Sequence, residues 1–213
     1  MIKVGVIFGG ESVEHEVSII SAIQAMNKMD SEKYEIVPIY ITKDGEWFTG
    51  DFLKEVETFQ DMSLIKKYAK NVILYRRNGS YVLQSKGFFR TIVKEIDIAF
   101  PIVHGTNCED GTIAGFVTLL GLPFVGPDIV ASSIGMDKIL QKKILRQSGI
   151  SVVDFVSFYS VEYIKDEEKI LKDIEKELKY PMIVKPGNLG SSVGIKKAKN
   201  HQPILAFSFF SSP

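Results

Sequence analysis

IKVGVIFGG, residues 2–10, is a nearly continuous apolar run closed by two glycines. Such a run is typical of a strand buried on both faces of a parallel sheet. Beyond it, Ile19, Ile23 and Met26 recur at helical spacing, with Ser12 as a candidate N-cap. Residues 34–41, YEIVPIYI, predict a second strand and so a right-handed βαβ unit. The glycine turn lacks the GxGxxG pattern, which disfavours a nicotinamide or flavin enzyme.

Two further signals extend this first domain. Asn78-Gly79 separates VILY from YVLQ, a pattern typical of a hairpin. Residues 96–104, IDIAFPIVH, predict another buried strand, and residues 113–120 predict a helix that ends before Gly121. Ligands of open α/β sheets bind at the carboxyl ends of parallel strands, so we expect Glu14 and His104 to face the same crevice.

The pattern changes after Gly126-Pro127, where we place a domain boundary. Residues 137–148 predict a helix rich in Lys and Arg, and residues 152–158 predict a strand. A strongly charged helix is expected at about 166–178, followed by a strand that ends at Lys185. Residues 193–198 then predict a returning strand.

The stretch YPMIVKPGNLGSSVG, residues 180–194, delivers a lysine at the end of a strand and then opens into a glycine-serine loop. Backbone N–H groups, serine hydroxyls and an ammonium group can converge there on phosphate oxygens, and glycines let the backbone come close. The alternative is that Gly and Ser only form the turn of a surface hairpin and bind no ligand. Composition alone favours this alternative.

The overall composition is that of a soluble globular protein, with 45% hydrophobic and 24% charged residues. Twenty-six basic residues balance twenty-six acidic ones, which removes any case from composition for binding nucleic acid or an anionic membrane. No apolar run reaches the length of a spanning helix, and the N-terminus lacks a signal-peptide pattern, so we expect a cytoplasmic protein. Cys108 is the only cysteine, which excludes an intrachain disulfide and a cysteine metal cluster.

Four separated stretches together carry a family resemblance: FGGESVEHEVS at 8–18, FPIVHGTNCEDGT at 100–112, GMDK at 135–138 and IVKPGNLGSSVG at 183–194. Their identities, order and spacing closely resemble those of the D-alanine D-alanine ligases, a branch of the ATP-grasp superfamily. The resemblance implies an α/β fold with a Rossmann-like N-terminal domain and a parallel sheet over residues 1–127. A small α+β ATP-grasp central domain is implied over residues 128–200, followed by a divergent tail at 201–213, with the C-terminal ATP-grasp domain absent.

The resemblance also implies roles for individual residues. Glu14 matches the glutamate that holds the amino group of the first D-alanine, Ser191 the serine that bonds this glutamate, and His104 the histidine near the substrate carboxylate. The residues matched to ATP-phosphate contacts are Lys138, Lys185 and Ser192, with Gly190 and Gly194 in the same loop. ATP and Mg²⁺ are the implied cofactors, D-alanine and ATP the small-molecule partners, and a homodimer through the N-terminal domain the implied assembly. No residue of this chain is assigned to the metal.

Each assignment has a simpler alternative. Lys138 and Lys185 could be solvated surface lysines, Glu14 could favour a helix N-terminus through the dipole, and His104 could be structural. His15 is interpreted as structural or supporting. For Glu109 and Asp110, which resemble metal ligands, we prefer capping at the start of the following helix. Cys108 stands where the family pattern has glycine, and we assign it no nucleophilic role.

The last residues depart from the family. Residues 201–213, HQPILAFSFFSSP, contain no Asp, Glu, Lys or Arg, and family members continue for well over a hundred residues. The missing part carries the Mg²⁺ ligands and adenine contacts, so we expect the 213-residue chain not to form the dipeptide. Two other functions stay open: a non-catalytic binding or dimerisation fragment, and a ligase that uses D-serine or D-lactate as its second substrate.

Overall fold

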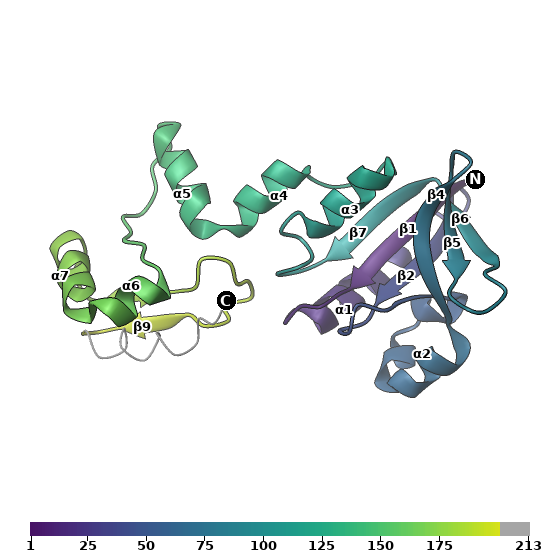
Figure 1. Ribbon diagram of the computed structural model, residues 1–213, viewed down its shortest axis with the longest axis horizontal. Coiled ribbons are helices and arrows are strands. Elements are labelled where there is room, and N and C mark those ends of the chain that lie inside the picture. The colour runs from purple at the N-terminus through teal and green to yellow at the C-terminus, as the bar shows by residue number, and fades with distance from the viewer. Residues whose placement is uncertain (201–213) are drawn as a thin grey trace. The chain divides into compact units, whose positions relative to one another are not determined.

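The computed structural model describes residues 1–200 and divides the chain into two compact units (Figure 1). The first unit is Met1–Ser133, and the second begins at Ile134. This limit lies inside helix α4, Ile129–Met136, whereas the expected functional boundary after residue 127 precedes that helix and stays a prediction. Residues 201–213, expected to be a divergent tail, lie outside the described residues.

A seven-stranded sheet in the order β6-β5-β4-β3-β2-β1-β7 organises the first unit. Its strands are β1 (Ile2–Gly9), β2 (Tyr34–Ile41), β3 (Trp47–Thr49), β4 (Lys70–Arg77), β5 (Ser80–Ser85), β6 (Ile92–Ile96) and β7 (Ile98–Val103). Strand β1 pairs in parallel with β2 and β7, whereas β2 to β6 pair in antiparallel fashion. The predicted parallel sheet is therefore confirmed for β2-β1-β7 only. The predicted Asn78-Gly79 hairpin joins β4 to β5, and a two-residue turn can connect only antiparallel strands.

Helices cover both faces of this sheet, which is why β1 is apolar at nearly every position. The helical elements of the first unit are α1 (His15–Met26), the 3₁₀ helices Asp51–Lys54 and Val56–Gln60, α2 (Met62–Tyr68), α3 (Thr112–Leu120) and the start of α4. Val6 and Phe8 pack in the core that contains the buried residues of α1 and α2, while Ile7 packs in the core that contains those of α3. Successive side chains of β1 therefore point to opposite faces of the sheet and pack in two separate hydrophobic layers.

Helix α1 begins later than Ser12 predicted. Its N-cap residue is Glu14, whose side chain makes no capping bond, and the Ser12 hydroxyl accepts from the Glu14 N–H at 3.1 Å. The expectation that Ser12 is the N-cap is therefore wrong. Ser12 instead closes the turn between β1 and α1 and fixes the entry of Glu14 into the helix.

The second unit is a small α+β arrangement, as expected. It contains α5 (Lys138–Gln147), α6 (Ser160–Lys165), α7 (Glu167–Glu177) and the antiparallel pair β8 (Met182–Val184) and β9 (Lys196–Ala198). Its core gathers Tyr163, Ile174, Met182 and Ala198.

One strand prediction for this unit is wrong, and another is confirmed only in part. Residues 151–159, expected to include a strand, have neither helical nor strand structure, although their apolar alternation suggested one. Phe155 of this segment instead lies under the side chains of Lys142 and Arg146 of α5. The returning strand covers Lys196–Ala198 only, because residues 190–195 form turns. Among residues 1–200, no helix combines the length and the apolar character needed to cross a membrane.

Candidate functional site

The carboxyl ends of β1 and β7 bring Glu14 and the loop after His104 together. Glu14 is buried, with 8% of its surface exposed, although it stands at the N-cap of α1. A Cβ atom placed on Gly105, whose φ is +80°, would lie 2.8 Å from Glu14 Oε2. The backbone after His104 can therefore pass beside this carboxylate only because residue 105 is glycine. The predicted meeting of the two loops at one edge of the sheet is confirmed.

The His104 ring makes two contacts at the same edge of the sheet. Its Nε2 lies 3.3 Å from Ser21 Oγ of α1, and its Nδ1 lies 3.5 Å from Glu109 Oε2. The Ser21 hydroxyl donates to the Val17 carbonyl at 2.8 Å, so it is placed to accept from His104. His104 therefore links the loop after β7 to helix α1 and to Glu109.

Ser18 of α1 was not recognised from the sequence, although it lies within the quoted EHEVS motif. It is fully buried; its hydroxyl accepts from the Gly9 N–H at 2.8 Å and donates to the Ile102 carbonyl at 2.5 Å. One side chain thus fastens α1 to the ends of both β1 and β7. A buried-polar position on an otherwise apolar helix face was the only available signal.

His15 has the structural role expected of it. Its Nδ1 donates to the Gly10 carbonyl at 2.6 Å, which leaves Nε2 of the neutral ring to accept from the Tyr40 hydroxyl at 2.9 Å. Burial, followed by the charges of Glu16 and Asp44, raises the pKa of Tyr40 to about 12. This chain of bonds ties the turn that carries Glu14 to strand β2.

The polar loop before α3 contains the two acidic residues and the cysteine. The N-cap residue of α3 is Gly111, and Asp110, one position earlier, accepts from the N–H of Thr112, the first helical residue, at 3.1 Å. Glu109 contacts His104 instead, which the capping interpretation missed. Cys108 is buried, and burial followed by the charges of Asp110 and Glu109 raises the pKa of its thiol to about 11. Asn107, with φ of +61°, takes the left-handed conformation in this loop.

In the second unit, Lys138 opens α5. Asp137 caps this helix by accepting from the N–H groups of Ile139 and Leu140 at 2.9 and 3.0 Å. The Lys138 N–H donates to the Gly187 carbonyl at 2.9 Å, and its ammonium donates to the Leu189 carbonyl at 2.5 Å. The start of α5 and the glycine-serine loop, two of the predicted ATP-contacting segments, are thus in direct contact.

The glycine-serine loop itself consists of two successive tight turns. The Val193 N–H donates to the Gly190 carbonyl at 3.0 Å, and the Ile195 N–H donates to the Ser192 carbonyl at 3.2 Å. Ser191, Ser192 and Gly194 have φ values of +46°, +61° and +74°. Left-handed conformations at two consecutive non-glycine residues are costly and are concentrated at ligand-binding segments. Ser191, Ser192 and Gly194 are exposed, as a phosphate-binding loop requires.

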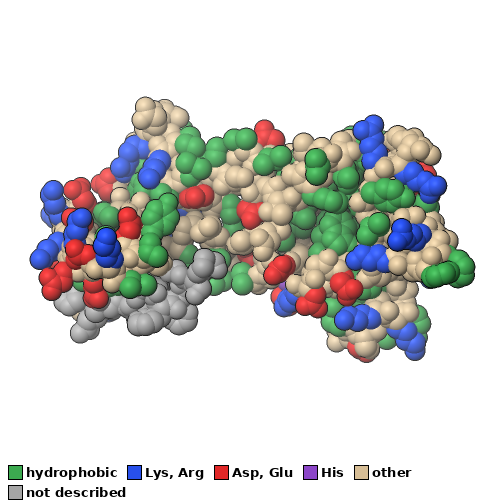
Figure 2. Space-filling view, in the orientation of Figure 1, with side chains coloured by type: hydrophobic (Ala, Val, Ile, Leu, Met, Phe, Trp, Pro, Cys, Tyr) green, Lys and Arg blue, Asp and Glu red, His purple; other side chains and the backbone are tan. Residues whose placement is uncertain are grey.

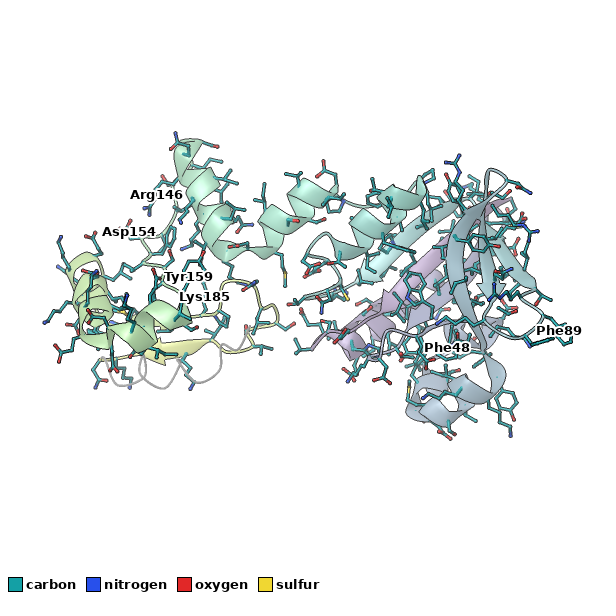
Figure 3. The ribbon with its side chains drawn as sticks, in the orientation of Figure 1. Phe48, Phe89, Arg146, Asp154, Tyr159 and Lys185 are labelled. Atoms are coloured by element: carbon teal, nitrogen blue, oxygen red, sulfur yellow. The ribbon has the colours of Figure 1, made fainter. Side chains whose placement is uncertain are left out.

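A basic group of side chains accompanies this loop, and the sequence singled out only one of them, Lys185, which follows the end of β8. Lys142 and Arg146 project from α5 and lie over the Phe155 ring. Figure 3 labels Arg146 and Lys185. Partial burial, followed by the positive charges of Lys185 and Arg146, lowers the pKa of Lys142. Neighbouring cations that repel one another favour a bound anion.

The metal expectation can be tested only on the described residues. Within residues 1–200, no three His, Cys, Asp or Glu side chains converge in a way that could hold a metal ion. The expected bond between Ser191 and Glu14 would join the two units, and it stays a prediction.

Comparison with known sequences identifies the family. The sequence profile described as D-ala D-ala ligase N-terminus matches residues 3–127, and the profile described as D-ala D-ala ligase C-terminus matches residues 144–208. The D-alanine--D-alanine ligase of Natranaerobius thermophilus is 45% identical, with 96% of this chain and 55% of the relative covered. That of Thermosipho melanesiensis is 43% identical, with 92% and 52% covered. The chain thus spans about half the length of the curated relatives it matches.

Solved structures agree in fold. The D-alanine-D-alanine ligase from Coxiella burnetii is 31% identical, with a TM-score of 0.79 and coverage of 97% of this chain and 57% of that chain. The VanG D-Ala:D-Ser ligase from Enterococcus faecalis is 34% identical, with a TM-score of 0.78 and coverage of 98% and 58%. The profile match over most of the first unit, together with the placement of the EHEVS and HGxxxEDG motifs at one sheet edge, shows that this chain belongs to the D-alanine D-alanine ligase family.

Proposed function

We propose that the first unit binds D-alanine at Glu14, in an ATP-dependent ligase that joins two D-alanines. The observation that carries the proposal is the buried Glu14 carboxylate, which lies beside Gly105, the residue that follows His104. A carboxylate in a partly dry crevice is a suitable partner for a substrate ammonium group. His104, whose ring contacts Ser21 and Glu109, is the proposed partner for the substrate carboxylate.

ATP is proposed as the second ligand, bound in the second unit. Lys138, Lys185 and Ser192 would contact its phosphates, with Gly190 and Gly194 allowing the loop backbone to approach. ATP supplies the phosphoryl group that turns the carboxylate of one D-alanine into an acyl phosphate, which the amine of the other can attack. The contribution of this chain is charge neutralisation, which phosphoryl transfer needs more than bond-making by the protein. No step is assigned to Mg²⁺.

The second substrate is inferred to be D-alanine. The curated relatives that are 45% and 43% identical are D-alanine--D-alanine ligases. The D-Ala:D-Ser ligase structure is 34% identical and favours D-serine as the alternative. We also propose a cytoplasmic homodimer through the first unit, which sedimentation of the purified chain would test by its mass.

The chain spans about half the length of the curated relatives it matches, so activity is best tested in a fusion. Residues 1–200 of this chain would be joined to the part of the Natranaerobius thermophilus ligase that follows its aligned region. The fusion should release ADP and form D-alanyl-D-alanine when ATP and D-alanine are both present. L-alanine is the control substrate, and the relative itself is the control for the assay. A folded fusion that binds neither D-alanine nor ATP would contradict the proposal.

A further inference from the structure

Acidic and basic residues are equal in number but unevenly distributed along the chain. Between Met62 and Lys94 there is no Asp or Glu. The same segment contains eight basic residues: Lys66, Lys67, Lys70, Arg76, Arg77, Lys86, Arg90 and Lys94. Because the whole chain is neutral, the remainder is acidic by the same amount. This basic segment is formed by α2, β4, β5 and the first part of β6.

These positive charges are largely uncompensated. Among the residues that the structure describes, only Lys94 of the eight forms an ion pair, with Glu35 at 3.2 Å. The ammonium of Lys67 lies over the Tyr68 ring at 5.1 Å, and the guanidinium of Arg76 lies 5.9 Å from the Tyr81 ring. Figure 2 shows basic and hydrophobic side chains side by side over this part of the first unit. An acidic ligand would find little competition from the protein's own carboxylates.

Two phenylalanines stand at the apex of the loop between β5 and β6. Phe88 is 95% exposed and Phe89 is 86% exposed, and Figure 3 places Phe89 at the outer rim of the unit. They occupy the two central positions of a turn closed by the Arg90 N–H and the Gly87 carbonyl at 3.1 Å. Small and polar residues normally occupy such positions, because exposed aromatic rings gain nothing from water. Their presence indicates a function in contact with another surface.

The loop that carries these rings is held by several hydrogen bonds. The Gln84 side-chain amide donates to the Arg90 carbonyl at 2.7 Å. The Ser85 N–H donates to the Thr91 carbonyl at 2.9 Å, and the Thr91 N–H donates to Ser85 Oγ at 3.0 Å. The two rings meet edge to face, with centroids 5.4 Å apart. The apex therefore presents a preformed apolar tip.

Basic residues lie on both sides of this tip in sequence, and a backbone hydrogen bond brings another basic residue near its base. The Lys86 N–H donates to the Asn71 carbonyl at 3.0 Å, which places the start of β4 beside the loop. Lys70 immediately precedes Asn71, and Lys86 and Arg90 flank the phenylalanines in sequence. Tyr68, at the end of α2, is 58% exposed and adds a third aromatic ring near Lys70.

We propose that the Ser85–Thr91 loop, with Lys70 and Tyr68, docks the protein on an anionic lipid surface. Aromatic side chains enter the interfacial region of a bilayer, while Lys and Arg are attracted by its negative headgroups. A nucleic acid that stacks its bases would call for aromatic rings along a basic groove, whereas these two rings stand together at the tip of one turn. A second copy would place this basic patch against itself in a two-fold interface, where like charges repel.

Vesicle co-sedimentation of the purified chain tests the proposal. The parent chain should bind vesicles that contain about one-third phosphatidylglycerol, and not vesicles of phosphatidylcholine alone. The Lys86→Glu/Arg90→Glu variant should lower the partition coefficient at least roughly tenfold, since each lost cation weakens attraction to the headgroups. Phe88→Ser/Phe89→Ser should lower it as well. Matched controls are Lys176→Glu/Lys179→Glu for the charge change and Leu119→Ser, at an 86% exposed position, for the apolar change.

A fluorescence measurement distinguishes loss of membrane binding from misfolding of a variant. In Phe89→Trp, brominated phosphatidylglycerol vesicles should quench the new tryptophan, whereas the Trp47 emission of the parent should be unchanged. Failure of the parent to bind anionic vesicles, or equal binding by tip and control variants, would overturn the proposal. Tip-dependent binding to an oligonucleotide without vesicle binding, or tip-dependent dimerisation, would also overturn it.

Discussion

The ammonium group of Lys138 lies 2.5 Å from the carbonyl oxygen of Leu189, across 51 positions of sequence. Together with the bond from the Lys138 N–H to the Gly187 carbonyl, it fastens the glycine-serine loop to the first turn of α5. In this structure the side chain thus organises the loop that is proposed to hold ATP phosphates. A phosphate role would add to this structural one, because an ammonium group has three donors.

Lys138→Ala is expected to affect both stability and nucleotide binding. Loss of a hydrogen bond from a charged donor should lower the free energy of unfolding by roughly 1.5–3 kcal/mol. ATP affinity of the fusion should fall as well, which calorimetric titration would measure. Lys143→Ala, at an exposed position one turn further along α5, is the control and should change neither quantity. Wild-type ATP affinity in a folded Lys138→Ala fusion would refute the phosphate role.

Substitutions at Ser192 separate its hydroxyl from its backbone conformation. Ser192→Ala keeps the cost of a φ of +61°, whereas Ser192→Gly removes it. Both lack the hydroxyl, so both should weaken ATP binding by about 1 kcal/mol in the fusion. The glycine variant should be the more stable of the two in denaturant unfolding. If ATP affinity is unchanged in both, Ser192 serves only the turn.

The sequence predicts the elements that have strong periodicity or explicit turn signals. Residues 34–41 form a strand with the predicted bounds, and the Asn78-Gly79 hairpin is present. Apart from this hairpin, the antiparallel pairings of β2 with β3, β3 with β4 and β5 with β6 were not predicted, because pairing partners are set by tertiary contacts that periodicity does not encode. Residues 152–158 alternate like a strand but lie under α5, where cation–π contacts with Phe155 replace ladder bonds.

Some site residues were predicted from the sequence, and others were missed. Glu14 and His104 were found because both follow buried strands, and their meeting at one edge follows from the parallel pairing of β1 with β7. Ser18 was missed although it stands on an otherwise apolar helix face, because the sequence does not show which strand ends its hydroxyl reaches. The Lys142–Arg146 pair was missed because the sequence does not show that two cations share an aromatic ring. The contact of Glu109 with His104 depends on the path of a loop, which residue type alone does not fix.

Tyr40 should make the first unit sensitive to alkaline pH. Its folded-state pKa is raised to about 12, above the usual tyrosine pKa of about 10, so the unfolded chain releases this proton first as the pH rises. The stabilisation is fully present below pH 10 and is lost between about pH 10 and 12. Tyr40→Phe should flatten this decline in urea titrations at several pH values.

Tyr40→Phe also removes the hydrogen bond that the Tyr40 hydroxyl donates to His15 Nε2. It should therefore lower the free energy of unfolding by about 1–3 kcal/mol at neutral pH. Tyr75→Phe, at a half-buried tyrosine of β4, is the control. An equally steep alkaline decline in Tyr40→Phe would contradict this assignment of the proton.

Cys108 is expected to be chemically inert in the folded chain. Its thiol is 2% exposed, and its pKa is raised to about 11, so little thiolate forms near neutral pH. Reaction with a disulfide reagent at pH 8 should be at least roughly a hundredfold slower than in denaturant. Rapid modification of the native chain would contradict the buried position.

Gly10 and Cys108 should also be coupled energetically. A Cβ atom on Gly10 would lie 2.4 Å from Cys108 Sγ, so Gly10→Ala should destabilise the chain strongly. Cys108→Gly in the Gly10→Ala background should recover part of this loss. The part caused by the φ of +97° at residue 10 would remain.

The most direct test of the D-alanine site is the steady-state kinetics of Glu14→Gln in the fusion, with Glu16→Gln as the matched control. Glu16 is exposed on the same helix, and its hydrogen bond with Lys43 lowers its pKa. Loss of the charged partner of the substrate ammonium should lower kcat/KM for D-alanine roughly 10- to 100-fold in Glu14→Gln. The KM for ATP and the activity of Glu16→Gln should be unchanged. Wild-type kcat/KM for D-alanine in a folded Glu14→Gln fusion would contradict the assignment.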